Sequence, residues 1–166
     1  MTGPIMKKII TAILLLSTLA PPAFAAGNSG NIGVNVSLDN AIGIQGEFNV
    51  KKPVSVQIFL KNYSRNYLYG GPFGSYSYRY TAIGVAGIYD FSKEFSLHNK
   101  KTHPYAGLGL YSVSASFNGS GTYVDPSVNG GIYFTAGARY DITPDIDLDG
   151  NYNNFGGVTI GANFKF

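Results

Sequence analysis

The sequence predicts an all-β protein, an eight-stranded antiparallel up-and-down β-barrel that crosses a membrane. Several segments alternate apolar and polar residues with the period of two that a strand requires. Four of these segments repeat the same order of residue sizes on their apolar face. Beyond residue 25, no stretch is apolar for long enough to form a transmembrane helix. Because open sheet edges are not tolerated in lipid, membrane-crossing strands must close into a barrel.

Residues 1–25 have the order of a signal peptide that is removed on export. Lys7 and Lys8 form a positive start, an apolar run follows from Ile9 to Leu19, and Ala23-Phe24-Ala25 is a small-residue cleavage site. The apolar run is shorter than the ~20 residues that a membrane-spanning helix needs. We therefore expect residues 26–166 to form the barrel domain.

The composition of the remaining chain excludes some classes of protein. Without Lys7 and Lys8, ten basic and nine acidic residues remain. A net charge this close to zero does not support nucleic-acid binding. Cysteine is absent, so disulfides cannot stabilise the fold. The chain instead has 22 Gly, 13 Tyr and 11 Phe, a mixture that suits closely packed strands with aromatic ends.

Four segments end in the same way, with an aromatic, a polar and an apolar residue. Their apolar faces read large apolar, apolar, small, aromatic, apolar, with Ala136 as a small substitute at the second place. These faces are Ile42, Ile44, Gly46, Phe48, Val50; Ile83, Val85, Gly87, Tyr89, Phe91; Phe134, Ala136, Ala138, Tyr140, Ile142; and Val158, Ile160, Ala162, Phe164, Phe166. The opposite faces are small or polar, except at Ile88. An apolar belt with aromatic rims around a polar lumen is typical of a transmembrane barrel.

A soluble β-sandwich or lipocalin-like barrel is the alternative fold. Such a protein would turn its apolar face inward to form a core. The polar faces here carry Glu47, Arg139 and Lys165, which favours a polar lumen inside a membrane barrel.

The partner strands lie between the repeated segments. They are expected near residues 32–38, 54–61, 104–117 and 146–152, which brings the total to eight. In residues 104–117 the apolar residues change face after Leu110, and a β-bulge there would explain the change. The strand register from Pro104 to Phe117 is left open.

The connections predict an orientation. Residues 51–53 and 143–145 are short turns, whereas residues 62–75 and 118–129 are long and rich in Gly, Tyr, Ser and Asn. Bacterial barrels keep short turns in the periplasm and long loops outside the cell. The connection from Phe91 to His103 is a longer periplasmic exception.

The C-terminus resembles the signal read by the outer-membrane assembly machinery. In TIGANFKF, the residues Thr159, Gly161, Phe164 and Phe166 occupy each place of that pattern. The chain from about residue 30 resembles the small bacterial outer-membrane barrels, the OmpA-barrel, OmpX and opacity-type families, and PYAGLGLY at Pro104 to Tyr111 is similar to a segment common among them. The resemblance implies a place in the bacterial outer membrane, with membrane lipid, lipopolysaccharide and the assembly machinery as partners.

Catalysis, a cofactor and a bound metal are not expected. Some barrels of this size modify lipid A, but the His-x-Ser pattern of the deacylase is absent, because Asn99-Lys100 follow His98 and Pro104-Tyr105 follow His103. The segment from His98 to His103 places two lysines between its histidines, which disfavours a metal. A solvated turn is the expected reading, with a lipid-headgroup site as the alternative.

A network of polar groups is expected in the lumen. Its members are Glu47, Arg139, Asp147, Asp149 and Lys165. The two aspartates lie on the strand between those of Arg139 and Lys165, so cross-strand ion pairs are expected. The network would form a closed polar plug or, as the alternative, a narrow gated ion path.

The segment from Asn62 to Tyr80 is the most distinctive predicted surface loop. Its candidate binding residues are Tyr63, Arg65, Tyr67, Tyr69 and Tyr76. Tyrosine and arginine are enriched at binding hot spots, and the candidate ligands are glycans, lipopolysaccharide phosphates or a host protein. An interfacial aromatic girdle is the alternative.

These observations predict a non-enzymatic outer-membrane barrel with a structural or surface-interaction role: membrane integrity, adhesion or resistance to host defence. A narrow channel for small solutes or ions is the second hypothesis, and a lipid A-modifying enzyme is the third and least favoured. The sequence leaves open the ligand, the oligomeric state and whether the lumen conducts.

Overall fold

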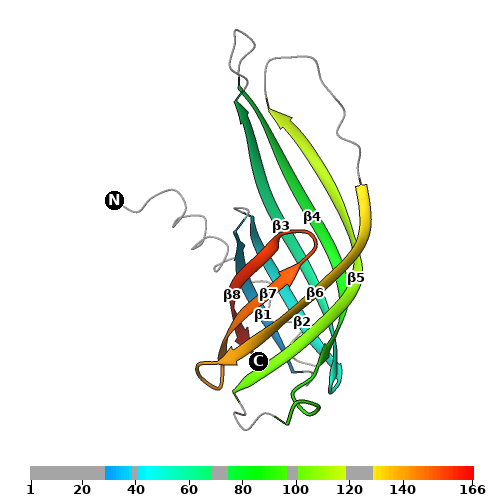
Figure 1. Cartoon of the computed structure of the whole chain (residues 1–166), viewed down its shortest axis with the longest axis vertical. Coiled ribbons are helices and arrows are strands. Elements are labelled where there is room, and N and C mark those ends of the chain that lie inside the picture. The colour runs from blue at the N-terminus through cyan, green and yellow to red at the C-terminus, as the bar shows by residue number, and fades with distance from the viewer. Residues whose placement is uncertain (1–28, 39–40, 69–74, 97–100, 119–128) are drawn as a thin grey trace, which may run out of the picture.

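The computed structural model describes residues 29–38, 41–68, 75–96, 101–118 and 129–166 and contains eight strands. The strands are β1 (Gly30–Ser37), β2 (Ile42–Lys51), β3 (Val54–Leu68), β4 (Ser75–Asp90), β5 (Thr102–Asn118), β6 (Asn129–Asp141), β7 (Ile146–Asn153) and β8 (Gly157–Lys165). Each strand pairs antiparallel with the next, and β1 pairs with β8, so the sheet closes (Figure 1). The predicted fold class is confirmed.

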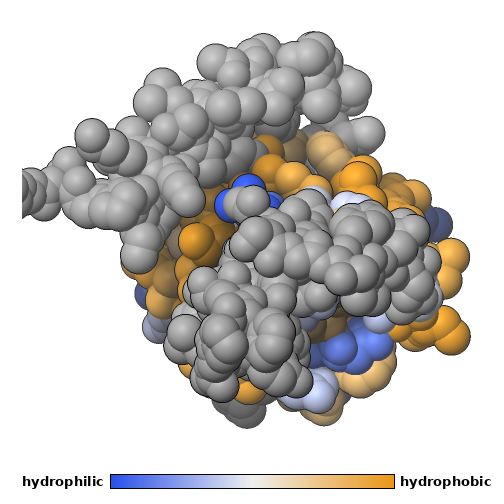
Figure 2. Space-filling model, turned by 90° about the horizontal axis from the view of Figure 1, so that it is seen from above, coloured by the Kyte–Doolittle hydropathy of each residue, from blue (hydrophilic) through white to orange (hydrophobic). Residues whose placement is uncertain are grey.

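The wall of the barrel separates two kinds of surface. Outward side chains are large and apolar, and Ile83, Leu108 and Ile160 are each more than half exposed. Figure 2 shows hydrophobic residues around the outer circumference of the barrel. Inward neighbours on the same strands, such as Ala82 and Thr159, are buried. This alternation follows from the period of two along each strand.

The described residues contain no helix that is long and apolar enough to cross a membrane.

Three strands rise well above the others at the end drawn uppermost in Figure 1. β3 pairs with β2 only as far as Asn62, but it pairs with β4 as far as Leu68. β5 pairs with β6 only as far as Val113, but with β4 as far as Asn118. We call residues 63–68, 75–80 and 114–118 the raised sheet. The prediction of one long loop from residue 62 to 80 is therefore wrong, because only residues 69–74 lie outside the described strands.

The predicted bulge near Leu110 is also wrong. The ladders from β5 to β4 and β6 run without a shift through this region. Leu110 faces outward, Tyr111 lies partly buried, and Ser112 is exposed. Beyond Leu110, the outward positions of β5 carry Ser112 and Ser114, so the apolar outer face of this strand ends without a shift of register. The structure does contain a bulge, between Asn49 and Lys51 at the lower end of β2.

A cluster of apolar and aromatic side chains fills one side of the interior. It consists of Phe59, Ala86, Ile88, Tyr105 and Tyr133, all buried. The rings of Phe59 and Tyr133 lie 4.4 Å apart between their centroids. Gly84 is the cross-strand partner of Phe59, and a Cβ at this glycine would collide with the Phe59 ring. The close approach of the two strands' interior surfaces therefore requires glycine at position 84.

We predict that Gly84→Ala destabilises the barrel by about 1–3 kcal/mol, because the interior is overpacked. Gly150→Ala is the matched control, since a Cβ at this outward position would meet nothing within 4 Å. Urea unfolding in detergent micelles, followed by tyrosine fluorescence because the chain has no Trp, measures both variants. Equal unfolding midpoints for the two variants would contradict this packing argument.

Candidate functional site

The interior of the barrel is polar along β1, β2, β7 and β8 and mixed along β3 to β6. The buried polar side chains on β3 and β6 are Ser55, Gln57, Lys61, Thr135 and Arg139. The buried polar side chains on β1, β2, β7 and β8 are Asn31, Asn35, Ser37, Gln45, Glu47, Asp147, Asp149, Asn151, Asn153, Thr159 and Asn163. The buried apolar side chains within strands β3 to β6 are Phe59, Ala82, Ala86, Ile88, Tyr105 and Tyr133. Eight-stranded barrels have interiors just wide enough for side chains to fill. The candidate site is therefore a packed polar network.

An ion pair between Glu47 and Arg139 crosses the lumen. These residues lie on β2 and β6, which are four strands apart and so form opposite walls. Arg139 Nη1 donates to Glu47 Oε1 at 3.0 Å, and Nη2 contacts Oε2. Ser55 Oγ also donates to Glu47 Oε1, at 2.6 Å, and the Arg139 guanidinium lies 4.4 Å from the centre of the Tyr105 ring. Both charged side chains are almost fully buried, so each depends on the other.

Asp149 does not pair with Arg139 as expected from the sequence. The two residues are register partners on β7 and β6. The Asp149 carboxylate instead accepts hydrogen bonds from Tyr105 Oη at 2.8 Å, Gln45 Nε2 at 3.2 Å and Asn151 Nδ2 at 3.3 Å. Neutral donors therefore satisfy Asp149, and the guanidinium reaches across the lumen to the carboxylate of Glu47.

Asp147 also lies in the interior, and no described cation forms an ion pair with it. Its Oδ1 accepts from Asn163 Nδ2 at 2.7 Å. Asn163 Oδ1 accepts in turn from Gln45 Nε2 at 3.0 Å, and Gln45 Oε1 accepts from Asn35 Nδ2 at 3.0 Å. Asp147 and Asp149 are thus joined through the amide side chains of Asn163 and Gln45 into one connected network.

Lys61 is a buried lysine that the sequence analysis did not assign to the lumen. Its ammonium lies 5.9 Å from the centre of the Phe59 ring, and its side chain is almost fully buried. No hydrogen bond from this ammonium to an acceptor is found among the described residues. Lys61 shares a face with Ser55, Gln57 and Phe59, so its place in the alternation was the signal that could have revealed it.

An aromatic cap lies above the network, at the base of the raised sheet. The rings of Tyr63 and Tyr80 stack with centroids 4.9 Å apart. Phe155, in the turn between β7 and β8, lies 6.2 Å from Tyr63 and 5.4 Å from Tyr111. These four partly buried rings narrow the upper end of the lumen.

Of the predicted surface-binding residues, the structure places four. Tyr63 itself is one of its rings and not part of a loop. Arg65 and Tyr67 lie on β3 and Tyr76 on β4, all within the raised sheet. Tyr69 lies outside the described residues.

A second polar cluster lies at the lower end of the barrel and is partly exposed. Lys165 Nζ donates to Asp141 Oδ1 at 2.6 Å, and not to the aspartates of β7 as expected. His103 Nε2 lies 3.3 Å from Asp141 Oδ2, and its Nδ1 lies 3.0 Å from Ser92 Oγ. The prediction that His103 belongs to a connection is wrong, because it is the second residue of β5. His98 lies outside the described residues.

The contact between Ser92 and His103 does not form a nucleophile with its base. The Ser92 hydroxyl donates to Asp90 Oδ1, and the Ser92 backbone N–H donates to the same atom at 2.7 Å. The hydroxyl proton is thus directed at a carboxylate and not at the imidazole, whereas a general base must accept it. Among the described residues, no set of three or more His, Asp or Glu side chains is arranged to hold a metal ion.

The residues of the predicted assembly signal lie along β8 and at its end. Thr159 points into the lumen and is buried, whereas Phe164 is exposed on the outer face. Phe166 packs edge-to-face against Phe48, with ring centroids 6.4 Å apart. The signal itself stays a prediction.

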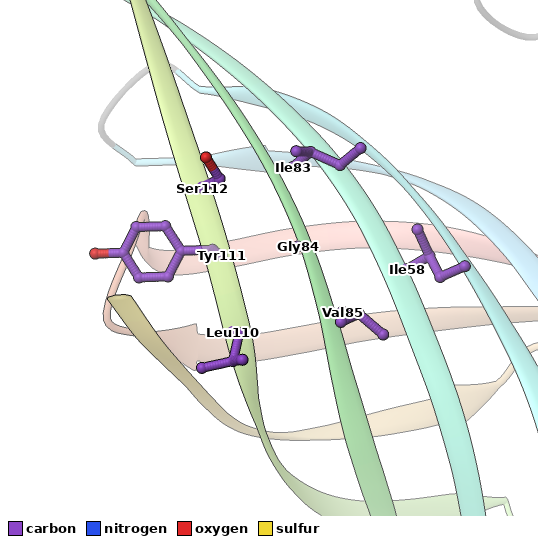
Figure 3. Close-up of a pocket in the computed structure, with 7 residues that line it drawn as sticks. All are labelled: Ile58, Ile83, Gly84, Val85, Leu110, Tyr111 and Ser112. Atoms are coloured by element: carbon purple, nitrogen blue, oxygen red, sulfur yellow. The ribbon is translucent and has the colours of Figure 1, made fainter. Parts of the chain in front are cut away.

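A shallow apolar groove of about 420 Å³ crosses the outer face of β3, β4 and β5. Figure 3 shows its lining, which is Ile58, Ile83, Gly84, Val85, Leu110, Tyr111 and Ser112. The groove contains no charged group, and most of its lining belongs to the outward apolar belt. It is therefore part of the surface that faces acyl chains and offers no chemistry of its own.

Comparisons with known proteins agree with this fold. The family described as "Opacity family porin protein" matches residues 54–165, more than half of the chain. Among curated proteins, no relative matches the sequence. The structure is similar to Neisserial surface protein A, NspA, at 20% identity, with a TM-score of 0.58 and coverage of 84% of this chain and 94% of that one.

Two further solved barrels have similar shapes. Ail of Yersinia pestis, in complex with the heparin analogue sucrose octasulfate, has 12% identity and a TM-score of 0.52, covering 84% of this chain and 96% of that one. The N-terminal barrel of Pseudomonas aeruginosa OprF has 16% identity and a TM-score of 0.50, with the same coverage of 84% and 96%. At these identities the similarity concerns the fold alone.

We predict that Arg139→Ala lowers the free energy of unfolding by about 3–5 kcal/mol, because it leaves Glu47 as an unpaired buried charge. The double variant Glu47→Ala/Arg139→Ala loses less than the two single variants together. Lys165→Ala is the control, since its partly exposed pair contributes about 1 kcal/mol or less. Urea unfolding in lipid vesicles measures all four. An Arg139→Ala effect as small as that of Lys165→Ala would show that the central pair is not a structural contact.

Proposed function

The chain belongs to the opacity family of outer-membrane porin proteins, and we propose that it is a non-enzymatic barrel with a structural or interactive role at the cell surface. In this proposal the signal peptide of residues 1–25 directs export, and the assembly machinery inserts the barrel. The end that carries the raised sheet faces the outside of the cell. The roles that fit are membrane integrity, adhesion and resistance to host defence.

The observation that carries the proposal is the contrast between a filled interior and the raised sheet. From the lower end upward, the interior holds the cluster around Asp141, the Glu47–Arg139 pair, the aromatic cluster around Phe59 and the ring of Tyr63. These layers leave little room for a solute, whereas three strands project beyond the rest of the wall. The projecting surface is therefore the part that can meet a partner.

The chemistry of residues 62–80 supports an interactive role. This segment contains six tyrosines, Arg65 and Arg79, and no acidic residue. Aromatic and arginine side chains supply much of the binding energy at protein interfaces. Ail was solved with a heparin analogue, so a barrel of similar shape can meet a ligand. Lipopolysaccharide is the other partner expected around the wall of this chain.

A narrow ion channel is the second candidate function. The observation in its favour is that a single ion pair, Glu47 with Arg139, spans the middle of the lumen. A swing of the guanidinium toward Asp149, its register partner on β7, would move the barrier aside. The buried ammonium of Lys61 would then be the next charge above it.

We predict that the refolded chain of residues 26–166 is silent in planar-bilayer conductance. Arg139→Ala should produce openings if the central pair is the only barrier, and Lys165→Ala serves as the control at the rim. Discrete openings of the wild-type protein that change with Arg139→Ala would instead establish the channel. Silence of every folded variant would confine the function to the surface.

We further predict that shortening the raised sheet abolishes attachment to host cells and leaves the barrel folded. Residues 64–79 are replaced by Asn-Gly, which joins Tyr63 and Tyr80 through a two-residue hairpin turn. These two residues are a hydrogen-bonded pair, because such pairs alternate along the ladder from Pro53 with Asp90. Phe95→Ala, an exposed residue at the lower end, is the control. Bacteria that express each form are counted on epithelial cells and after exposure to serum. Unchanged attachment and serum survival with the shortened form would end the surface-interaction proposal.

A further inference from the structure

The stacked rings of Tyr63 and Tyr80 in the aromatic cap bring two phenols into contact. Their centroids lie 4.9 Å apart, and their planes are 17° from parallel. Every other ring pair found among the described residues includes a phenylalanine. Two adjacent phenols can undergo an oxidative coupling that is not open to a pair with a phenylalanine.

The sheet holds these two rings beside each other. Tyr63 on β3 and Tyr80 on β4 are register partners, and they continue the inward rows of Lys61 and Ala82. They are the first pair of the β3–β4 ladder above Asn62, the last residue of β3 that pairs with β2. The contact therefore depends on the folded sheet and is lost when the chain unfolds.

The composition of the mature chain makes tyrosine a main target of oxidants. Cysteine and methionine are the side chains that usually react first, and tryptophan competes with tyrosine for one-electron oxidants. The chain has no Cys and no Trp, and its two methionines, Met1 and Met6, lie in the segment that the proposed export removes. All 13 tyrosines lie within residues 26–166. An oxidant that reaches the mature protein therefore acts mainly on phenols.

The pair lies at a level where the outer face of the sheet is polar. Asn62, Thr81 and Ser114 are register partners and form a polar row across β3, β4 and β5. Tyr63 and Tyr80 follow directly above this row, and both side chains are only partly buried. A water-soluble oxidant can therefore approach the two phenols from the upper end of the barrel.

We propose that Tyr63 and Tyr80 are a site of oxidative cross-linking, which hydrogen peroxide and a haem peroxidase convert into dityrosine. Each phenol loses one electron and its hydroxyl proton, and the two radicals form a C–C bond between the ring carbons next to the hydroxyl groups. The hydrogen on each of these carbons then moves to the phenolic oxygen, which restores both phenols. Hydrogen peroxide takes up the two electrons and two protons, its O–O bond breaks, and two water molecules form.

The cross-link fixes the base of the raised sheet. At this level β3 has lost β2 as a neighbour, so β4 is the strand that holds it among the described strands. A covalent bond between β3 and β4 restricts the unfolded chain in the same way as a disulfide. The cross-linked protein is therefore the more stable form, and the modification goes beyond the proposed surface role.

Trypsin makes the proposed bond easy to identify. Cleavage after lysine and arginine gives the peptides 62–65, 66–79 and 80–93 from this region. Tyr63 is the one tyrosine of the first peptide, and Tyr80 belongs to the third. The tyrosines of the raised sheet between them fall in the middle peptide. A bond between the first and third peptides therefore distinguishes the proposed pair from these neighbours.

The full mature chain in lipid vesicles is treated with hydrogen peroxide and a haem peroxidase. We expect dityrosine fluorescence, and we expect mass spectrometry to find peptides 62–65 and 80–93 joined, with the loss of two hydrogen atoms. Tyr63→Phe and Tyr80→Phe keep a ring in the cap and should each lose this product. Tyr89→Phe is the matched control, because Tyr89 lies in the same tryptic peptide as Tyr80 but at the lower end of β4, and it should keep the product.

The same treatment in urea tests whether the fold selects the pair. The unfolded chain has no register and should spread its cross-links over many tyrosines. Equal shares of the joined peptides in the folded and unfolded chains would overturn the proposal. So would the absence of dityrosine from the folded protein, or bonds that join only other peptides.

Urea unfolding then measures the effect of the bond. The treated wild type should unfold at a higher urea concentration than the untreated protein, and treatment should leave the midpoint of Tyr63→Phe unchanged. An equal shift in both would show that oxidation elsewhere in the chain causes it, and would contradict the stabilising role of the cross-link.

Discussion

The ladder between β1 and β8 is the constraint on which the rest of this structure depends. In hydrocarbon, every backbone N–H and C=O group needs a partner within the protein, because no water is available. Pairing from Asn31 with Lys165 up to Ser37 with Thr159 joins the two ends of the sheet. Closure also gives the wall an inside and an outside, so the alternation along each strand places every side chain in one of two environments.

Closure with eight strands also makes the interior narrow. A buried charge there needs a partner of opposite charge, because no bulk water surrounds it. Glu47 and Arg139 are such partners and meet from opposite walls. Phe59 takes the space that Gly84 leaves on the next strand. The interior is thus packed in the manner of a protein core although much of it is polar. The same ion pair joins opposite walls of the barrel and spans its lumen.

The requirement for a closed sheet ends where the belt ends. Above Asn62, β3 runs on without β2, because water can satisfy backbone groups that lipid cannot. The outer face of β5 also becomes polar near this level, where Ser114 pairs with Thr81 and Thr81 pairs with Asn62. One strand therefore serves as membrane wall below and as open sheet above. The proposed interactions of this protein depend on that second part.

Periodicity and composition alone were enough to predict eight strands, the closed barrel and the face on which Glu47 and Arg139 lie. Alternate residues of a strand point to opposite faces, and in a closed sheet these faces are the inside and the outside. The same pattern led to the wrong prediction of a bulge in β5, because a change of surroundings and a bulge both move the apolar residues to the other face in the sequence. Contacts across the lumen were not predictable. The alternation of side chains along β6 indicates that Arg139 points inward, but it does not indicate that Glu47 lies opposite it. That partnership and the pairing of Lys165 with Asp141 depend on the stagger between strands, as does the end of the β2–β3 ladder at Asn62. Only the closed sheet fixes this stagger.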